Sequence, residues 1–407
     1  MKSQVQETSL SIWAEVYPEA IADNCRLARR SVPENARVMA VVKADGYGHG
    51  AVQTARTALK SGADCLAVAR LEEALALRRA GIRADILIFG APAPDQADQL
   101  LERDLIQTVF DLETSTALSQ RARSLGGRIR VHLKVDTGMG RLGVVAVREG
   151  TTETEPHGEA MDQAESISCL SGLRMEGIYT HFARADEPDR DFTRLQLARF
   201  HSVVDGLRER GIDIPLRHAA NSAALLAMPE THLDMVRPGL MLYGLTPLAD
   251  KSPANLGLSP ALNLKARISQ VKRTGPHFPI SYGSVHTTDR ETWIATLPVG
   301  YADGYKRCLS PGVEVLFRSQ RVPVVGRICM DQTMIDLGKV DSPQEGEEVV
   351  LLGSQNGNEV SAEELAGICG TISYEIVTAL TSRVPRVYRA ASRGGSALSF
   401  IRSSSQP

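Results

Sequence analysis

Residues 38–50 read VMAVVKADGYGHG, and this stretch decides the fold. The apolar run 38–42 is rich in β-branched and aliphatic side chains, typical of a buried strand, and it ends at a lysine and a glycine-rich turn. Seven similar runs follow, at 65–69, 86–89, 105–110, 129–135, 175–180, 216–219 and 235–237, with amphipathic segments between them. Because parallel strands need helical crossovers, this alternation predicts a (β/α)8 barrel. The first and last runs are short, so a doubly wound sheet is the alternative.

The pattern changes after Gly244. Strand-like runs occur at 262–272, 292–297, 313–317, 322–325, 332–336 and 348–352, with one helical stretch at 362–368. We therefore predict an α/β protein with a (β/α)8 barrel over 10–250, followed by a mainly β domain over 251–390. The Ser/Gly-rich segment 391–407 is predicted to be a disordered tail.

The composition is that of an ordinary globular protein. The 407 residues are 43% hydrophobic and 23% charged, which excludes disorder and fibrous repeats. With 46 basic and 48 acidic residues the formal charge is -2, which gives no electrostatic signature of a nucleic-acid or membrane partner. The six scattered cysteines predict no disulfide framework. Without an apolar signal core or a run of membrane-spanning length, the chain is expected to be soluble and cytoplasmic.

Two lysines, Lys43 and Lys134, each end an apolar run. Barrel enzymes place their active-site residues at the C-terminal ends of the strands. Partial burial there lowers the pKa of a lysine, as a Schiff-base lysine requires, and either lysine fits that role. The structural alternative for Lys43 is an ion pair with Asp45 or Asp136.

The last two predicted strands are followed by Asn221-Ser222-Ala223 and Arg237-Pro238-Gly239-Leu240. In barrels, the loops at these positions often bind phosphate through backbone N–H groups. The alternative is an ordinary N-cap serine and a turn. His181 ends the sixth strand, where a core histidine is the commoner interpretation. No histidine has the spacing of a metal ligand, so we predict no catalytic metal.

Polar and aromatic clusters in the second half, at 281–283, 300–305 and 329–332, taken alone are typical of turns and edge aromatics. Nine segments together, however, resemble the alanine racemase family: VVKADGYGHG, KVDTGMGRLG, THFA, NSAA, RPG, SYG, GYADGY, GRICMDQ and ISYEIVTAL…RVPR. The resemblance implies a pyridoxal-phosphate enzyme that interconverts L-alanine and D-alanine and supplies D-alanine for peptidoglycan. It also implies a barrel followed by a β domain, and a head-to-tail homodimer in which the partner completes each active site.

The resemblance also assigns roles around the cofactor. Lys43 is expected to bind it as a Schiff base and to act as acid and base on the D-side of the substrate. Tyr282 of the other subunit is expected to be the opposite base, acting on the L-isomer. Arg237 is expected to hydrogen-bond the pyridine nitrogen, and His181 to link it to Tyr282. The residues expected to hold the phosphate are Tyr47, Ser222, Gly239, Leu240 and Tyr374.

The remaining roles concern the substrate. Arg141 is expected to contact the phenolic oxygen of the cofactor and the substrate carboxylate. Lys134 matches a position that is carbamylated in many family members, where the added carboxylate fixes that arginine. Met330 and Asp331 are expected to line the substrate side from the partner chain, with Tyr301 guarding the entrance.

The chemistry explains these residue types. Racemisation removes a proton from Cα on one face and returns one on the other, so two bases must flank a planar carbanion. Burial lowers the pKa of a lysine from about 10.4, which suits the first role. A tyrosine needs nearby cations to act as a base, and the link between His181 and Arg237 supplies positive charge. Arginine cannot accept a proton from the pyridine nitrogen, so the ring is a weaker electron sink and transamination is suppressed.

Other enzymes remain as alternatives. A barrel-type pyridoxal-phosphate amino-acid decarboxylase shares the two-domain plan. It usually places an acidic residue and a cysteine where this chain has Arg237 and Tyr282. A serine or broad-specificity racemase differs in pocket volume, and one methylene changes selectivity by only about 1–3 kcal/mol. A non-catalytic cofactor carrier of this barrel type would lack the β domain. The polar stretch between Arg141 and His181 is longer than usual for the family, and residues 144–170 within it are predicted to be a solvated loop or helix.

Overall fold

The computed structural model describes residues 10–147, 153–248, 250–338 and 340–389. The strands of its first half are β2 (Arg37–Val41), β3 (Cys65–Val68), β4 (Ile86–Ile88), β5 (Ile106–Val109), β6 (Ile129–Asp136), β8 (Leu173–Tyr179), β9 (Leu216–His218) and β10 (Met235–Val236). All pair in parallel, and the pairs β10–β2 and β5–β6 close the sheet into a barrel. Each of the eight predicted runs overlaps one of these strands, so the predicted (β/α)8 barrel is confirmed.

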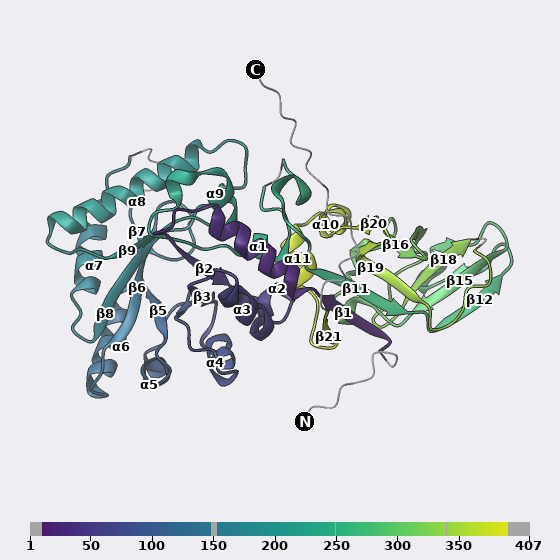
Figure 1. Ribbon diagram of the computed structural model, residues 1–407, viewed down its shortest axis with the longest axis horizontal. Helices are drawn as coiled ribbons and strands as arrows, with labels where there is room; N and C mark the ends of the chain where they lie inside the picture. Colours follow the sequence, from purple (N-terminus) through teal and green to yellow (C-terminus); the bar gives the residue numbers. More distant parts are fainter. Residues whose placement is uncertain (1–9, 148–152, 249, 339, 390–407) are drawn as a thin grey trace, which may run out of the picture.

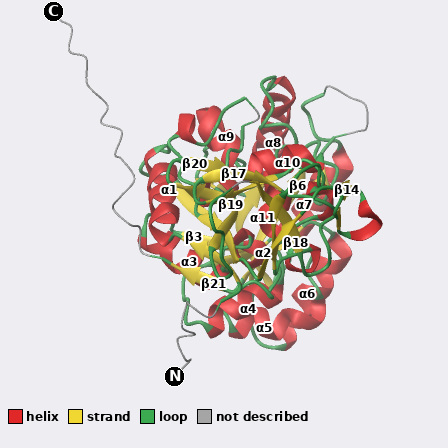
Figure 2. Cartoon of the chain, turned by 90° about the vertical axis from the view of Figure 1, so that its right-hand side faces the viewer, coloured by secondary structure: helices red, strands yellow, loops and turns green. Residues whose placement is uncertain are grey.

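Helices surround the barrel strands, as Figure 2 shows. They are α1 (Pro18–Arg30), α3 (Ala51–Lys60), α4 (Leu71–Arg79), α5 (Ala97–Glu102), α6 (Leu112–Ser124), α7 (Gly158–Ser168), α8 (Asp191–Glu209) and α9 (Ser222–Ala227), with the single turn α2 (Lys43–Tyr47) directly after β2. Each helix buries one face against the strands; in α1 this face includes Ile21, Cys25 and Ala28, at helical spacing.

The polar stretch 144–170 contains the short strand β7 (Val144–Val145) and the helix α7. The prediction allowed a helix here, but α7 is not simply solvated. Its residues Ala160, Met161, Ala164 and Ile167 are buried, because they recur on one face of the helix. Residues 148–152 and the predicted disordered tail 391–407 lie outside the described residues.

The second half is mainly β, as predicted. Its strands are β11 (Leu262–Arg267), β12 (Gln270–Thr274), β13 (Pro279–Ile280), β14 (His286–Thr287), β15 (Thr292–Leu297), β16 (Glu314–Phe317), β17 (Gln320–Pro323), β18 (Thr333–Gly338), β19 (Glu348–Gln355), β20 (Asn358–Val360) and β21 (Arg386–Tyr388), with helices α10 (Ala362–Cys369) and α11 (Ser373–Thr378). The predicted run 262–272 is two strands, because the chain passes from the β11 sheet into the separate sheet β12-β15-β18 after Ile268.

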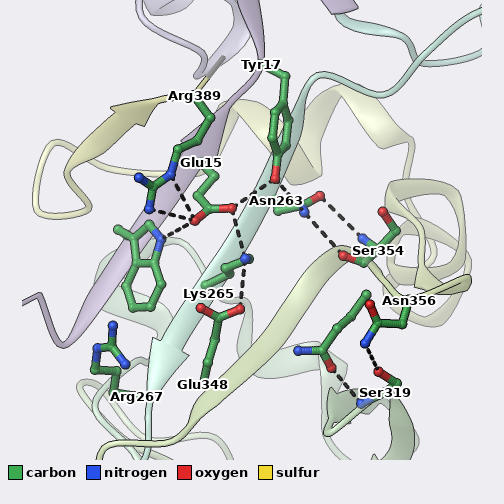
Figure 3. A network of polar contacts seen from close by, with 12 residues as sticks. Glu15, Tyr17, Asn263, Lys265, Arg267, Ser319, Glu348, Ser354, Asn356 and Arg389 are labelled. Atoms are coloured by element: carbon green, nitrogen blue, oxygen red, sulfur yellow. Dashed lines mark hydrogen bonds and ion pairs between the residues drawn. The ribbon is translucent and has the colours of Figure 1, made fainter. Parts of the chain in front are cut away.

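The N-terminal strand β1 (Ile12–Val16) joins the second half. It lies between β11, which is antiparallel to it, and β21, which is parallel to it. Its buried Glu15 anchors a polar network that joins β1 to β11, β19 and the residue after β21 (Figure 3). The carboxylate lies 2.9 Å from the Lys265 amine, accepts hydrogen bonds from Trp13 and Tyr17, and pairs with Arg389 at 3.3 Å. These partners hold the pKa of Glu15 below its usual value despite burial, which raises it.

Short 3-10 helices occur at η2 (Pro94–Gln96), η3 (Pro229–Thr231), η4 (Leu240–Tyr243), η5 (Ala254–Leu256), η6 (Tyr282–Ser284), η7 (Tyr301–Asp303) and η8 (Arg307–Leu309). The cysteine prediction is wrong for one pair, because Cys308 in η8 is bonded to Cys369 at the end of α10. The two are 61 residues apart in sequence, so their spacing gives no sign that folding brings them together. In the described part of the chain, every helix is too short or too polar to cross a membrane.

The barrel lies at one end of the long axis and the sheet β12-β15-β18 at the other, with α11 and β21 between them (Figure 1).

Candidate active site

A cavity of about 500 Å³ lies at the C-terminal ends of the barrel strands. Four basic side chains line it, Lys43, Lys134, Arg141 and Arg237, and within the described ranges no carboxylate does. This excess of positive charge favours an anionic ligand. Six other predicted site residues line the same cavity: Tyr47, His181, Ser222, Gly239, Leu240 and Tyr374.

Lys43 begins α2, two residues beyond the end of β2. Burial lowers the pKa of its amine below the usual value, and the nearby Arg141 guanidinium lowers it further. Asp45 and Asp136, the two carboxylates that could form an ion pair with Lys43, both accept hydrogen bonds from backbone N–H groups. Asp45 accepts a hydrogen bond from the backbone N–H of Ala51, and Asp136 accepts bonds from the backbone of its own loop. Within the described residues, no ion pair joins Lys43 to either of these carboxylates.

The backbone after Lys43 is strained. Ala44, Asp45 and Tyr47 have φ of 52°, 52° and 51°, in the left-handed region that these residues normally avoid. Gly46 between them has φ 61° and adopts this conformation without a Cβ penalty. Such strain is maintained only where surrounding contacts fix it, and it concentrates at functional sites. The turn buries the Tyr47 side chain in the cavity wall, stacked on Tyr243 with ring centroids 4.8 Å apart.

Arg141 is positioned by the loop that follows β6. One oxygen of Asp136 accepts hydrogen bonds from the backbone N–H groups of Gly138, Met139 and Gly140, at 2.9, 2.8 and 3.2 Å. The other oxygen accepts from the Arg141 N–H at 3.0 Å. The Asp136 carboxylate thus stabilises the conformation of the loop and fixes the backbone of Arg141.

Lys134 is 3% exposed and lies over the ring of Tyr179, 5.7 Å from its centroid. Burial lowers the pKa of its amine to about 8, and the cations Arg141 and Arg237 contribute. Tyr179 also lies below the Arg237 guanidinium, 5.2 Å from its carbon, and shares a 2.9 Å hydrogen bond with Thr108. The tyrosine ring therefore contacts two of the cations in the cavity wall.

Arg237 follows β10 and its contacts fix its orientation. Nη2 donates to the carbonyls of Thr180 and Ala219, at 2.8 and 2.9 Å, and lies 3.3 Å from Nδ1 of His181. Nη1 donates to Nδ1 of His218 at 3.0 Å. An arginine only donates, so both histidine nitrogens accept and the rings are neutral. Burial and the Arg237 charge hold the pKa of each histidine well below its usual value.

The loops after β9 and β10 meet at Ser222. Its Oγ accepts hydrogen bonds from the backbone N–H groups of Gly239 and Met241, at 2.8 and 3.4 Å. A Cβ at position 239 would lie 2.7 Å from the Tyr47 hydroxyl, so only glycine leaves this space open. The result is a polar cradle of hydroxyl and backbone N–H groups at one end of the cavity, with Tyr374 of α11 beside it.

The other predicted residues lie in the second half of the chain. Tyr282, Met330 and Asp331 line a separate cavity of about 740 Å³. The Tyr282 side chain is 71% exposed, and Tyr301 at the start of η7 is also exposed. Within one chain the structure therefore does not bring these residues to the cavity of Lys43.

Two family models match the chain: the alanine racemase N-terminal domain at residues 16–247, and the alanine racemase C-terminal domain at residues 261–388. The chain belongs to the alanine racemase family. The alanine racemase of Desulforamulus reducens is 49% identical over 377 residues, which cover 93% of this chain and 98% of the relative. That of Methanococcus maripaludis is 44% identical over 377 residues, covering 93% of this chain and 98% of that one.

Solved structures of alanine racemases agree with the fold. The enzyme from the D-cycloserine producer Streptomyces lavendulae superimposes with a TM-score of 0.86 at 38% identity, covering 95% of this chain and 98% of its own. The Bacillus anthracis enzyme with bound L-Ala-P gives a TM-score of 0.84 at 37% identity, covering 93% and 95%.

The aromatic residues Phe89 and Tyr179, which line the cavity, were not predicted from the sequence. Nor was His218, which accepts a hydrogen bond from Arg237 behind the cavity wall. The signal that could have found His218 is a polar side chain inside the predicted strand 216–219, where a barrel interior normally holds branched apolar residues. Phe89 and Tyr179 resemble ordinary core aromatics in sequence, so nothing local distinguishes them.

Proposed function

We propose that this chain is a pyridoxal-phosphate-dependent alanine racemase that interconverts L-alanine and D-alanine with one base on each face of the substrate. One observation carries the proposal: Lys43, whose pKa is lowered, shares a cavity with three other cations and no described carboxylate. An amine of this kind binds an aldehyde covalently, and the excess of positive charge suits a phosphate and a carboxylate.

The residues present fit the cofactor of the family. The groups that would hold its phosphate are Tyr47, Ser222, Gly239, Leu240 and Tyr374. The space that a Cβ at Gly239 would fill, beside the Tyr47 hydroxyl, supports this assignment. When bound, the cofactor supplies an electron-withdrawing ring that makes the Cα proton of an amino acid acidic. Arg237 would face its pyridine nitrogen, and because arginine only donates it takes no proton from there, which limits transamination.

Lys43 would hold and move a proton at Nζ on the D-side of the substrate. A base works best when its pKa is near the operating pH, and burial together with Arg141 moves the Lys43 pKa in that direction. Arg141 would bind the substrate carboxylate, since its backbone is fixed by Asp136 and its guanidinium forms a planar pair of donors.

Tyr282 would be the second base, supplied by the partner of a homodimer. Its side chain is exposed in the single chain, and Met330 and Asp331 line the same cavity around it. A second copy placed head to tail would bring this cavity over the barrel mouth, with His181 between Tyr282 and Arg237 and with Tyr301 at the entrance. His181 already lies 3.3 Å from Arg237.

Mixed dimers test this sharing of sites. Lys43→Ala and Tyr282→Phe chains, each inactive alone, are mixed and allowed to exchange subunits. About half of the dimers are then mixed, and each has one intact site, so about a quarter of the wild-type activity is expected. No recovery despite proven subunit exchange contradicts a site built from two chains.

Lys134 would carry a carbamate. The neutral amine attacks CO2, an N–C bond forms and one proton is released, which replaces a buried cation by an anion beside Arg141. The lowered pKa of Lys134 leaves much of the amine neutral near pH 8. Its carboxylate would then fix the arginine that binds substrate.

The proposed role is supply of D-alanine for peptidoglycan in the cytoplasm, which rests on the family. Alanine is the proposed preferred substrate because the cavity of about 500 Å³ must hold cofactor and substrate together. A serine or broad-specificity racemase differs only in that preference.

The reaction is tested by incubating the holoenzyme with single enantiomers of several amino acids and separating both enantiomers by chiral chromatography. Alanine is expected to interconvert well ahead of serine and larger side chains. Lys43→Ala is expected to lose activity together with the near-visible absorbance of lysine-bound cofactor. Decarboxylation products, or full activity in Lys43→Ala, would overturn the proposal.

A further inference from the structure

One arginine near the C-terminus joins two segments of the cavity wall. Nε of Arg386 donates to the carbonyl of Gly48 at 2.9 Å. Nη1 donates to the carbonyls of Thr381 and Val384, at 2.6 and 2.7 Å, and Nη2 donates to that of Leu380 at 2.8 Å. A single guanidinium therefore satisfies four backbone carbonyls from two segments that are more than three hundred residues apart in sequence.

Each of these segments carries a tyrosine of the polar cradle. Gly48 directly follows Tyr47, and residues 380–384 begin two residues after the end of α11, which contains Tyr374. The two tyrosine rings are 6.1 Å apart, centroid to centroid. Between them the backbones touch: a Cβ at Gly48 would collide with the carbonyl of Val377. The distance between the two hydroxyl groups thus depends on how these segments are held together.

We propose that Arg386 is a positioning residue for the cofactor phosphate, holding the strained turn of Tyr47 against the helix of Tyr374; this inference rests on the proposed function. The turn needs such support because Ala44, Asp45 and Tyr47 all adopt left-handed backbone conformations. The Tyr388 hydroxyl adds a weaker contact from the same strand, donating to the carbonyl of His49 at 3.3 Å.

Only arginine fits this position. Its planar guanidinium presents five N–H donors in fixed directions, whereas a lysine ammonium has three donors at one point. Arg386→Lys keeps the positive charge and loses the geometry that reaches both segments. The turn is then expected to relax and to move Tyr47 away from the phosphate position. Lys43, which would bind the aldehyde, precedes the strained residues and is expected to keep its place.

A matched control exists at the opposite end of the barrel. Arg78 of α4 also donates to four backbone carbonyls, those of Ile82, Ala84, Arg103 and Asp104, at 2.9, 2.8, 2.8 and 2.9 Å. These carbonyls lie in the loops that precede β4 and β5, so they are at the N-terminal ends of the strands. Arg78→Lys removes a comparable set of hydrogen bonds without touching the cavity.

The experiment compares two ligands that differ only in the phosphate. Full-length wild type, R386K and R78K are freed of cofactor and titrated with pyridoxal 5'-phosphate and with pyridoxal, following absorbance, and their thermal unfolding is recorded. In R386K, we expect affinity for pyridoxal phosphate to fall by about tenfold or more, the effect of losing one hydrogen bond from a charged donor, with pyridoxal affinity unchanged. In R78K, we expect a lower unfolding temperature and unchanged affinity for both ligands.

The proposal would be overturned if R386K lost affinity for both ligands equally. It would also be overturned if R386K bound pyridoxal phosphate as tightly as R78K does. If R386K does not fold, Tyr388→Phe is the second variant, and a fall of about threefold confined to pyridoxal phosphate is expected, a fraction of the effect of a full hydrogen bond. An unchanged affinity in that variant would then overturn it. Failure of the proposed function itself has a different signature, because wild type would then show no preference for pyridoxal phosphate over pyridoxal.

Discussion

Replacing Lys134 with methionine tests the electrostatics of the cavity. The pKa of Lys134 is lowered from 10.5 to about 8. Each pKa unit is worth about 1.36 kcal/mol, so charging this amine costs the folded protein about 3 kcal/mol more than it costs the unfolded chain. That cost is fully present below about pH 8 and is relieved as the pH rises toward 10.5, where the amine is neutral in both states. Lys134→Met removes the charge at similar volume.

Without CO2, the variant is therefore expected to be more stable than the wild type at pH 7, by up to about 3 kcal/mol, with the difference shrinking between pH 8 and 10.5. Unfolding in urea under CO2-free nitrogen measures this. The exposed Lys60 of α3 supplies the control, since Lys60→Met removes a lysine charge outside the cavity. At pH 8 about half of the Lys134 amines are neutral, against about one in three hundred for an ordinary lysine.

Carbon dioxide from bicarbonate should then form a carbamate on Lys134 selectively. We expect added bicarbonate to stabilise the wild type and Lys60→Met but not Lys134→Met, and native mass spectrometry to detect one added CO2 that acid removes. Two results would refute the reasoning. One is a stability advantage of Lys134→Met over the wild type that is no larger at pH 7 than at pH 10; the other is an equal bicarbonate response in all three proteins.

Three other predictions concern separate parts of the molecule. Tyr282→Phe should bind cofactor normally and lose Cα-proton exchange from L-alanine far more than from D-alanine, as followed by NMR in deuterated water; equal losses would count against the two-base assignment. Glu15→Gln should destabilise the protein by about 2 kcal/mol at pH 7, because a neutral amide loses the charge-assisted contact with the Lys265 amine at 2.9 Å. Since the pKa of Glu15 is lowered, this deficit should persist down to its usual value near 4.5 and shrink only as the pH falls through the lowered folded value, a trend that urea unfolding in an acid series can disprove. Thiol titration of the unfolded, unreduced protein should give four thiols, the free cysteines, and six after reduction; six before reduction would exclude the disulfide.

The sequence predicts the barrel because each strand has a local signal. Runs such as 38–42 and 86–89 are apolar along their whole length, as is typical of buried parallel strands, and turn residues follow them. The cavity follows from the same logic, since residues at the ends of parallel strands converge whatever the loops between them. Lys43, Lys134 and Arg237 therefore meet without any sequence signal that links one to another.

Contacts between distant segments have no such local signal. The strand β1 is apolar except for Glu15, and nothing in residues 12–16 indicates pairing with β11 and β21 rather than with the barrel. The Cys308–Cys369 disulfide and the donation from Arg237 to His218 are of the same kind. Each depends on side chains that folding brings together across a gap in sequence, so spacing alone cannot reveal them.

The proposed site is likewise divided between the barrel and the second half of the chain. The barrel supplies a rigid cradle, a lysine of lowered pKa and an arginine whose donors are fixed by backbone carbonyls. A single chain leaves Tyr282 and Met330 exposed, 71% and 53%, at its other end. Large side chains in such a position are normally covered by a partner surface. A dimer that covers them would at the same time add the second base, so the proposed association and the proposed chemistry have one structural cause.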